Sequence, residues 1–109
     1  MNTNELLKQI NVELDDLQAI DVNVLDVQGL TSVTDYMVIC SGRSTRHVKS
    51  LADNLIEKLK KRQVKALSQS GIDAGEWALI DYGDIVVHVM LPDIRAFYNL
   101  EGLWDSKTE

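Results

Sequence analysis

The sequence predicts an α/β (α+β) fold in which a mixed β-sheet is flanked by helices. Residues 4–17 and 48–59 carry apolar side chains at the spacing of amphipathic helices. Residues 77–81 and 85–91 are strand-like runs on either side of a glycine, as in a β-hairpin. A further run, residues 37–40, is apolar throughout, which is typical of a strand covered by helices on both faces.

The first third of the chain predicts one helix and two strands. Residues 4–17 form the helix, whose apolar stripe is Leu6, Leu7, Ile10, Leu14 and Leu17. Residues 21–28 form the first strand, with Val22 and Val24 buried and with Leu25 and Val27 as further candidates for burial. Residues 35–41 form the second strand, which contains the continuous apolar run and therefore belongs in the centre of the sheet.

The best-defined helix follows Gly42, where either Ser44 or Thr45 can cap its N-terminus. Its apolar stripe consists of Val48, Leu51, Ala52, Leu55, Ile56 and Leu59. Its last turns carry Lys58, Lys60, Lys61 and Arg62, and cations there stabilise the negative end of the helix dipole. This basic run therefore needs no nucleic-acid partner to explain it. A short third strand is predicted at residues 65–68, followed by a loop at residues 70–76.

The hairpin turns within residues 81–84, through a two-residue loop at Tyr82-Gly83 or a four-residue loop. Both loops predict the same register, in which Trp77 faces His88. In that register Leu79 faces Val86 and Asp81 faces Asp84. One face is wholly apolar and is predicted to be core: Ala78, Ile80, Ile85, Val87, Val89 and Leu91. The other face is mixed and is predicted to dock a partner: Trp77, Leu79, Asp81, Asp84, Val86, His88 and Met90. A short helix begins at Pro92-Asp93 and ends the fold.

Length and composition predict one domain, residues 1–109, with a core in about residues 4–104. The single cysteine, Cys40, has no internal disulfide partner, so we expect a reducing, cytoplasmic setting. The N-terminus lacks the pattern of a secretion signal, and no apolar run is long enough to span a membrane.

The net charge of −6 is confined to one part of the chain. Residues 1–72 contain nine acids and nine bases, whereas residues 73–109 contain eight acids and two bases. The part that carries the predicted docking face is therefore acidic, which disfavours bare phosphate backbones and favours basic proteins as partners. Acids that only keep a small domain soluble explain the same imbalance equally well.

The residues give little support for metal binding or nucleophilic catalysis. His47, His88 and Cys40 do not have the spacing of a zinc site. The serines near the start of the second helix lack the G-x-S-x-G pattern of a nucleophile elbow. We therefore expect no metal and no cofactor.

The turn at residues 39–44 has the form of a phosphate-binding turn, because Ser41-Gly42 lies between a strand and a helix near Arg43 and Arg46. Polymerase-beta-like nucleotidyltransferases combine such a turn with two carboxylates one residue apart that hold Mg²⁺. No Asp-x-Asp or Asp-x-Glu occurs in this chain. Two-metal phosphoryl transfer lacks its ligands, so we predict that the protein is not an enzyme.

Two long motifs carry a family resemblance: DYMVICSG followed by STRHVKSLADNL, and WALIDYGDIVVHVMLPDIRAFYNLEGLW. They strongly resemble the ribosomal silencing factor family, formerly called the oligomerisation-domain or iojap-like family. The likeness covers roughly residues 4–104. Its most specific parts are residues 44–48, residues 81–84 with 87–89, and residues 95–104.

The resemblance implies a fold related to nucleotidyltransferases but without their active site. It also implies binding to the large ribosomal subunit through large-subunit ribosomal protein fourteen. The bound factor would block association with the small subunit by occupying space, and translation would fall when nutrients are scarce. No covalent step is required.

The docking hypothesis assigns a role to each residue of the mixed face. Trp77 is the expected apolar anchor, while Asp81 and Asp84 pair with partner cations. His88 and Tyr82 add hydrogen bonds. The full predicted set is Trp77, Leu79, Asp81, Tyr82, Asp84, Val86, His88, Met90 and Tyr98.

Three alternatives remain open at this point. The mixed face could pack on the final helix or on a second copy of the chain, and in the latter case the protein could be a homodimerising interaction module without ribosome contact. An enzyme could use the Ser41–Arg46 turn to bind nucleotide. Arg43, Arg46 and Lys49 could also make a minor contact with ribosomal RNA.

Overall fold

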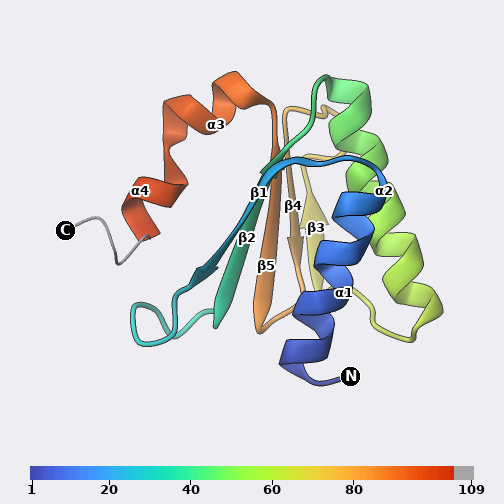
Figure 1. Ribbon diagram of the computed structural model, residues 1–109, viewed down its shortest axis with the longest axis vertical. Helices are drawn as coiled ribbons and strands as arrows, with labels where there is room; N and C mark the ends of the chain where they lie inside the picture. Colours follow the sequence, from blue (N-terminus) through green and yellow to red (C-terminus); the bar gives the residue numbers. More distant parts are fainter. Residues whose placement is uncertain (105–109) are drawn as a thin grey trace.

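A five-stranded mixed sheet with the strand order β1-β2-β5-β4-β3 forms the centre of the molecule (Figure 1). The computed structural model describes residues 1–104. The strands are β1 (Ile20–Asp26), β2 (Tyr36–Ser41), β3 (Ser68–Ser70), β4 (Trp77–Asp81) and β5 (Ile85–Met90). The helices are α1 (Thr3–Asp16), α2 (Thr45–Lys61), α3 (Pro92–Tyr98) and α4 (Leu100–Trp104). Strands β2 and β5 are parallel and the other pairs antiparallel, so the predicted mixed sheet flanked by helices is confirmed.

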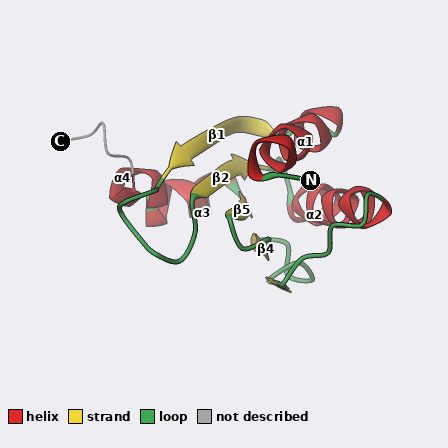
Figure 2. Cartoon of the chain, turned by 90° about the horizontal axis from the view of Figure 1, so that it is seen from below, coloured by secondary structure: helices red, strands yellow, loops and turns green. Residues whose placement is uncertain are grey.

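The two helix pairs lie on opposite sides of the sheet (Figure 2). Helices α1 and α2 cover what we call the first face, and α3 and α4 lie against what we call the second face. The first face holds the larger core cluster, in which Ile10 and Leu14 of α1 and Leu51 and Leu55 of α2 are buried against the strands. The second face holds a smaller cluster of Leu25, Val27, Met37, Ile39 and Met90.

Strand β2 is buried on both faces, as its apolar run predicts. Val38 and Cys40 belong to the first-face cluster, whereas Met37 and Ile39 belong to the second-face cluster. Its parallel partner β5 is likewise buried at all six positions. Both central strands therefore have the composition expected of strands between two layers of helices.

The second predicted helix is confirmed, and the structure decides which residue caps it. Ser44 is the N-cap, and its Oγ accepts a hydrogen bond of 3.1 Å from the backbone N–H of His47. The first helix has a complete capping box: Asn2 Oδ1 accepts from the backbone N–H of Glu5, and Glu5 Oε1 accepts from that of Asn2. Both helices are thus held at their N-termini by local side chains.

Two expectations about the outer strands are wrong. Val22 and Val24 of β1 are each 37% exposed, while Leu25 and Val27 are buried. Strand β1 is at the sheet edge and its pairing with β2 shifts between Ile20 and Asn23, so burial does not follow simple alternation from the start of the strand. The third strand lies at Ser68–Ser70 rather than 65–68, because residues 68–70 are the ones that pair with β4.

The hairpin exists, but its predicted register is wrong by two residues. Trp77 pairs with Met90, Leu79 with His88 and Asp81 with Val86. The backbone N–H of Tyr82 donates to the carbonyl of Ile85, which leaves Gly83 and Asp84 as the two-residue loop. Gly83 has φ of +88°, so the positive φ falls at the first loop position, as in a type II′ turn. A shift of two residues preserves the side-chain faces, so the predicted core face is still the core face.

The loop before β4 depends on Gly71, which has φ of +76°. A Cβ atom there would collide with the carbonyl oxygen of Trp77. We expect Gly71→Ala to reduce the free energy of unfolding by more than about 2 kcal/mol, because backbone strain and a clash with backbone combine. Chemical denaturation measures the loss.

Gly29 provides the matched control for this substitution. It has φ of +83°, but a Cβ atom there would meet nothing within 4 Å. Gly29→Ala should therefore show the backbone strain alone, about 1 kcal/mol. Equal losses in the two variants would show that the contact with Trp77 does not matter for stability.

Candidate partner-binding surface

The second face of the sheet is only partly open, because α3 and α4 cover one end of it. Met90 has no exposed surface and packs in the second-face cluster, against which Ile94 of α3 and Leu100 of α4 also lie. Val86 and His88 are buried as well, at 8% and 5% exposure. The expectation that all three side chains present themselves to a partner is corrected: β5 is a central strand, and its second face is core.

Tyr82 and Asp84 point away from the expected surface. Tyr82 belongs to the first-face cluster, because it continues the alternation of Ala78 and Ile80 along β4. Its phenol is buried, and burial raises its pKa to about 12. Asp84 is exposed at the turn, where its Oδ2 accepts a hydrogen bond of 2.9 Å from the hydroxyl of Thr3 in α1. Neither residue is therefore grouped with Trp77.

The part of the predicted surface that remains accessible is built around Trp77, which is half-buried on β4. Its ring centroid lies 5.0 Å from that of Tyr98 on α3, with the ring planes tilted by 52°. Phe97 lies beside Tyr98, with centroids 5.1 Å apart and an edge-to-face angle of 84°. We call Trp77, Tyr98 and Phe97 the aromatic row; pairs in such geometries stabilise one another beyond area burial alone.

The outer end of the aromatic row is open to solvent. Tyr98 is 53% exposed and Phe97 is 80% exposed. Phe97 was not among the predicted site residues, although the sequence places this aromatic residue directly before Tyr98. Leu79 and Asp81 are half-buried on the same strand as Trp77. Asp81 Oδ1 already accepts a hydrogen bond of 2.7 Å from the N–H of Gly83, so it also shapes the turn.

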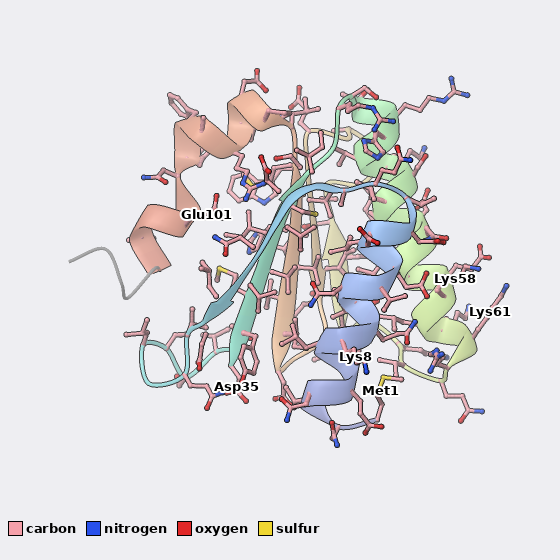
Figure 3. The ribbon with its side chains drawn as sticks, viewed as in Figure 1. Met1, Lys8, Asp35, Lys58, Lys61 and Glu101 are labelled. Carbon is pink, nitrogen blue, oxygen red and sulfur yellow. The ribbon has the colours of Figure 1, made fainter. Side chains whose placement is uncertain are left out.

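Helices α3 and α4 are fixed to the sheet by Arg95. Its Nε and one terminal nitrogen donate to the two carboxylate oxygens of Glu101 at 2.8 and 2.9 Å. Its remaining N–H groups donate to Ser41 Oγ and to the carbonyls of Ile20 and Asp21. Asn23 of β1 also donates to Glu101, whose side chain, labelled in Figure 3, belongs to α4. This network holds the two helices, and with them Tyr98, against β1 and β2.

Polar groups of the turn at residues 41–46 form hydrogen bonds within the protein. The N–H of Arg43 donates to Nδ1 of His47, and Nε2 of His47 lies 2.8 Å from the carbonyl oxygen of Leu17. A cavity of about 460 Å³ lies beside Ser41 and Arg95, but all five N–H groups of Arg95 already have acceptors in the protein. Arg95 therefore has no free donor to offer a phosphate.

Cys40 is buried in β2, as expected for a structural thiol. Burial raises its pKa to about 12, so the thiol stays protonated near neutral pH and is a poor nucleophile. Within residues 1–104, no three His, Cys, Asp or Glu side chains converge to hold a metal ion. No helix in that part of the chain has the length and apolar character needed to span a membrane.

His88 is the buried titratable group next to Trp77, and burial lowers its pKa from 6.5 to about 4. The unfolded chain therefore binds the proton more readily than the folded chain between these two values. The free energy of unfolding should therefore be unaffected by His88 protonation above pH 6.5. It should fall by up to about 3 kcal/mol as the pH drops toward 4. Denaturation titrations across this range would measure the change.

The variant His88→Leu has no group to titrate at this position, so its unfolding free energy should lose this part of the pH dependence. If the wild type and His88→Leu changed in parallel between pH 7 and pH 4, the assignment to His88 would be wrong.

Comparisons with known proteins give one consistent result. A family model described as "Ribosomal silencing factor during starvation" matches residues 1–109. The chain is 41% identical to the ribosomal silencing factor of Chromobacterium violaceum over 98% of its own length and 88% of that protein. A crystal structure of a Chromobacterium violaceum protein superposes with a TM-score of 0.94 at 40% identity, covering 100% of this chain and 92% of the other. A mouse relative named "Mitochondrial assembly of ribosomal large subunit protein 1" is 40% identical to this chain, and the match covers 81% of this chain and 40% of the mouse protein.

Proposed function

Because the chain belongs to the ribosomal silencing factor family, we propose that it binds the large ribosomal subunit and sterically blocks its association with the small subunit. We expect the direct contact to be large-subunit ribosomal protein fourteen and the setting to be the cytoplasm under nutrient limitation. The protein acts by occupying space, so it needs neither a cofactor nor a catalytic residue. The name of the mouse relative, which refers to assembly of the large subunit, supports the choice of subunit.

The observation that carries the proposal is the exposed aromatic row in the acidic part of the chain. Phe97 and Tyr98 are exposed, and they lie in a part of the sequence with eight acids and two bases. Exposed aromatic side chains in an acidic segment of the chain suit a basic protein surface, because the rings supply contact area while the charges set orientation and speed of approach. A ribosomal protein embedded in RNA offers such a basic surface.

The binding surface that we propose is narrower than the predicted set of nine residues. Trp77, Tyr98 and Phe97 form its centre, and Leu79 and Asp81 continue it along β4. His88, Val86 and Met90 support it from the buried side. Asp84 would contact the partner only if the surface extended around the turn toward α1.

Sedimentation with purified subunits tests the function directly. We expect the protein to sediment with isolated large subunits and not with small subunits. When it is added before the two subunits are mixed, the fraction of joined ribosomes should fall as its concentration rises. If joining is unchanged while large subunits are saturated with the protein, the steric mechanism is wrong.

The direct partner needs a separate measurement. Purified large-subunit ribosomal protein fourteen should bind the protein in a titration. A variant of that ribosomal protein in which the basic residues of the contact surface are replaced by neutral ones should not bind. If large subunits bind the protein but the isolated ribosomal protein does not, the contact is made elsewhere. A dependence on Arg43, Arg46 and Lys49, which are exposed at the start of α2, would then point to ribosomal RNA.

Self-association is a second use of the same exposed groups. Phe97 and Leu103 are 80% and 72% exposed, and apolar side chains of this size are often covered in homodimers. Analytical ultracentrifugation of the free protein measures its oligomeric state. A dimer that dissociates when large subunits are added would show that one surface serves both contacts.

A further inference from the structure

The central strand β5 contains one polar side chain at a position where an apolar one would be expected. Five of its six residues are Ile, Val or Met, and all six are buried. The exception, His88, is 5% exposed and lies between Ile39 of β2 and Leu79 of β4. Central strands covered on both faces are normally apolar throughout, so His88 calls for an explanation.

Within residues 1–104, the imidazole makes one hydrogen bond, and that bond is to Trp77. The indole N–H of Trp77 donates to Nδ1 of His88 at 3.0 Å. The ring centroids are 6.0 Å apart. Since Nδ1 accepts, a neutral ring carries its hydrogen on Nε2. Nε2 is buried and has no hydrogen-bond partner among the described residues.

This arrangement is unfavourable for the fold itself. A buried donor without an acceptor costs roughly 1–3 kcal/mol, whereas a neutral hydrogen bond contributes about 0.5–1.5 kcal/mol net. Burial of the imidazole also removes it from water, as its lowered pKa reflects. An aliphatic side chain would fill the position without either penalty. Stability alone therefore does not explain a histidine at position 88.

The hydrogen bond instead restricts the half-buried tryptophan at the edge of the accessible surface. The ring centroid of Tyr98 lies 5.0 Å from that of Trp77, and Nδ1 of His88 accepts a hydrogen bond from the indole N–H of Trp77. Both contacts restrict the orientation of the indole before a partner binds. An anchor that is already ordered loses less conformational entropy on binding.

We propose that His88 is a positioning residue of the partner-binding surface, which holds the indole of Trp77 in the orientation that the partner meets. The inference rests on the proposed function, because it takes Trp77 as a contact residue. His88 contributes to binding through Trp77 and itself touches no partner. The neutral state of the buried imidazole keeps Nδ1 available as an acceptor near pH 7.

Three variants separate this role from a structural one. His88→Leu removes the acceptor, and His88→Asn replaces it with an amide oxygen close to the position of Nδ1. Trp77→Phe removes the donor and keeps an aromatic ring. Each protein is studied by chemical denaturation, by titration with isolated large subunits, and by the NMR signal and hydrogen exchange of the Trp77 indole N–H. The Trp77→Phe spectrum identifies that signal.

We expect His88→Leu to unfold at the same or a higher denaturant concentration than the wild type at pH 7. It should nevertheless bind large subunits roughly two- to tenfold more weakly, which corresponds to ordering one side chain on binding. His88→Asn should recover most of the affinity. The indole N–H signal of Trp77 should shift and exchange faster in His88→Leu. In the Trp77→Phe background, His88→Leu should have no further effect on binding.

Several results would overturn the inference. An unchanged indole signal in His88→Leu would do so without reference to the ribosome. A loss of stability in His88→Leu, up to unfolding of the protein, would show that the histidine serves the fold. Wild-type affinity in His88→Leu, while Trp77→Ala binds weakly, would leave the proposed function intact and reject only the role of His88. If Trp77→Ala binds as well as the wild type, the proposed surface is at fault instead.

Discussion

Replacing Trp77 with alanine should weaken binding to the large ribosomal subunit by at least about 2 kcal/mol, or roughly 30-fold. The indole joins β4 to α3 through its contact with Tyr98, so truncation removes the anchor and leaves Tyr98 without its neighbour. A titration of isolated large subunits with labelled protein measures the loss. The fold should persist, because Trp77 is half-buried and at the edge of the second-face cluster.

Val12→Ala is the matched control for this experiment. Val12 is 52% exposed on α1, which covers the opposite face of the sheet. We expect its replacement to leave subunit binding unchanged. Equal effects of the two substitutions would show that exposed apolar area in general, and not the aromatic row, drives binding. Binding that survives Trp77→Ala with the fold intact would exclude Trp77 as the anchor.

The second large effect is expected from Arg95→Ala, which should reduce the free energy of unfolding by about 2–4 kcal/mol. The Arg95 side chain is 13% exposed and that of Glu101 is 26% exposed, so the ion pair is largely shielded from water. Removal of the guanidinium leaves the Glu101 carboxylate with Asn23 as its side-chain donor from the part of the chain that the structure describes. It also leaves the carbonyls of Ile20 and Asp21 without this donor. Chemical denaturation measures the change.

Arg46→Ala is the control for loss of a positive charge. Arg46 is exposed in the first turn of α2, where a cation gains nothing from the helix dipole. Its replacement should change stability by no more than about 0.5 kcal/mol. If Arg95→Ala proved equally mild, the network at α3 and α4 would not be what holds these helices to the sheet.

The two predictions are linked through α3. Arg95 and Tyr98 belong to the same short helix, and Asn99, with φ of +46°, separates it from α4. When Arg95 no longer holds the helix, Tyr98 loses its fixed place beside Trp77. We therefore expect Arg95→Ala to weaken subunit binding as well, even at temperatures where the protein remains folded.

The sequence predicts most of the fold correctly because its strongest signals are local. The apolar stripes of α1 and α2 fix which side of each helix is buried, and the sequence limits the cap of α2 to Ser44 or Thr45, of which the structure selects Ser44. The apolar run in β2 indicates cover on both faces. The predicted family membership is confirmed by the family model, which matches residues 1–109.

The candidate site is harder to predict, because exposure depends on distant parts of the chain. The alternation along β4 and β5 separates the two faces, but it does not say that α3 and α4 return over Met90. The alternation also does not determine which residues form the turn, because a register shift of two residues keeps every side chain on the same face of the sheet. Phe97 was missed for the same reason. It joins the surface through its contact with Tyr98, and Tyr98 reaches Trp77 only because α3 lies beside β4.

The sequence by itself determined most of the elements, the two faces of the hairpin and the family, because periodicity and motifs are properties of neighbouring residues. It misplaced β3 and predicted one final helix where the structure has α3 and α4. Only the tertiary structure decided that His88 and Met90 are buried, that Asp84 turns toward α1, and that an aromatic row remains in solvent. The physical reason is that burial on a sheet face is set by whichever helix packs there. Here the Arg95 network sets where that helix lies, through contacts across more than 70 residues of chain.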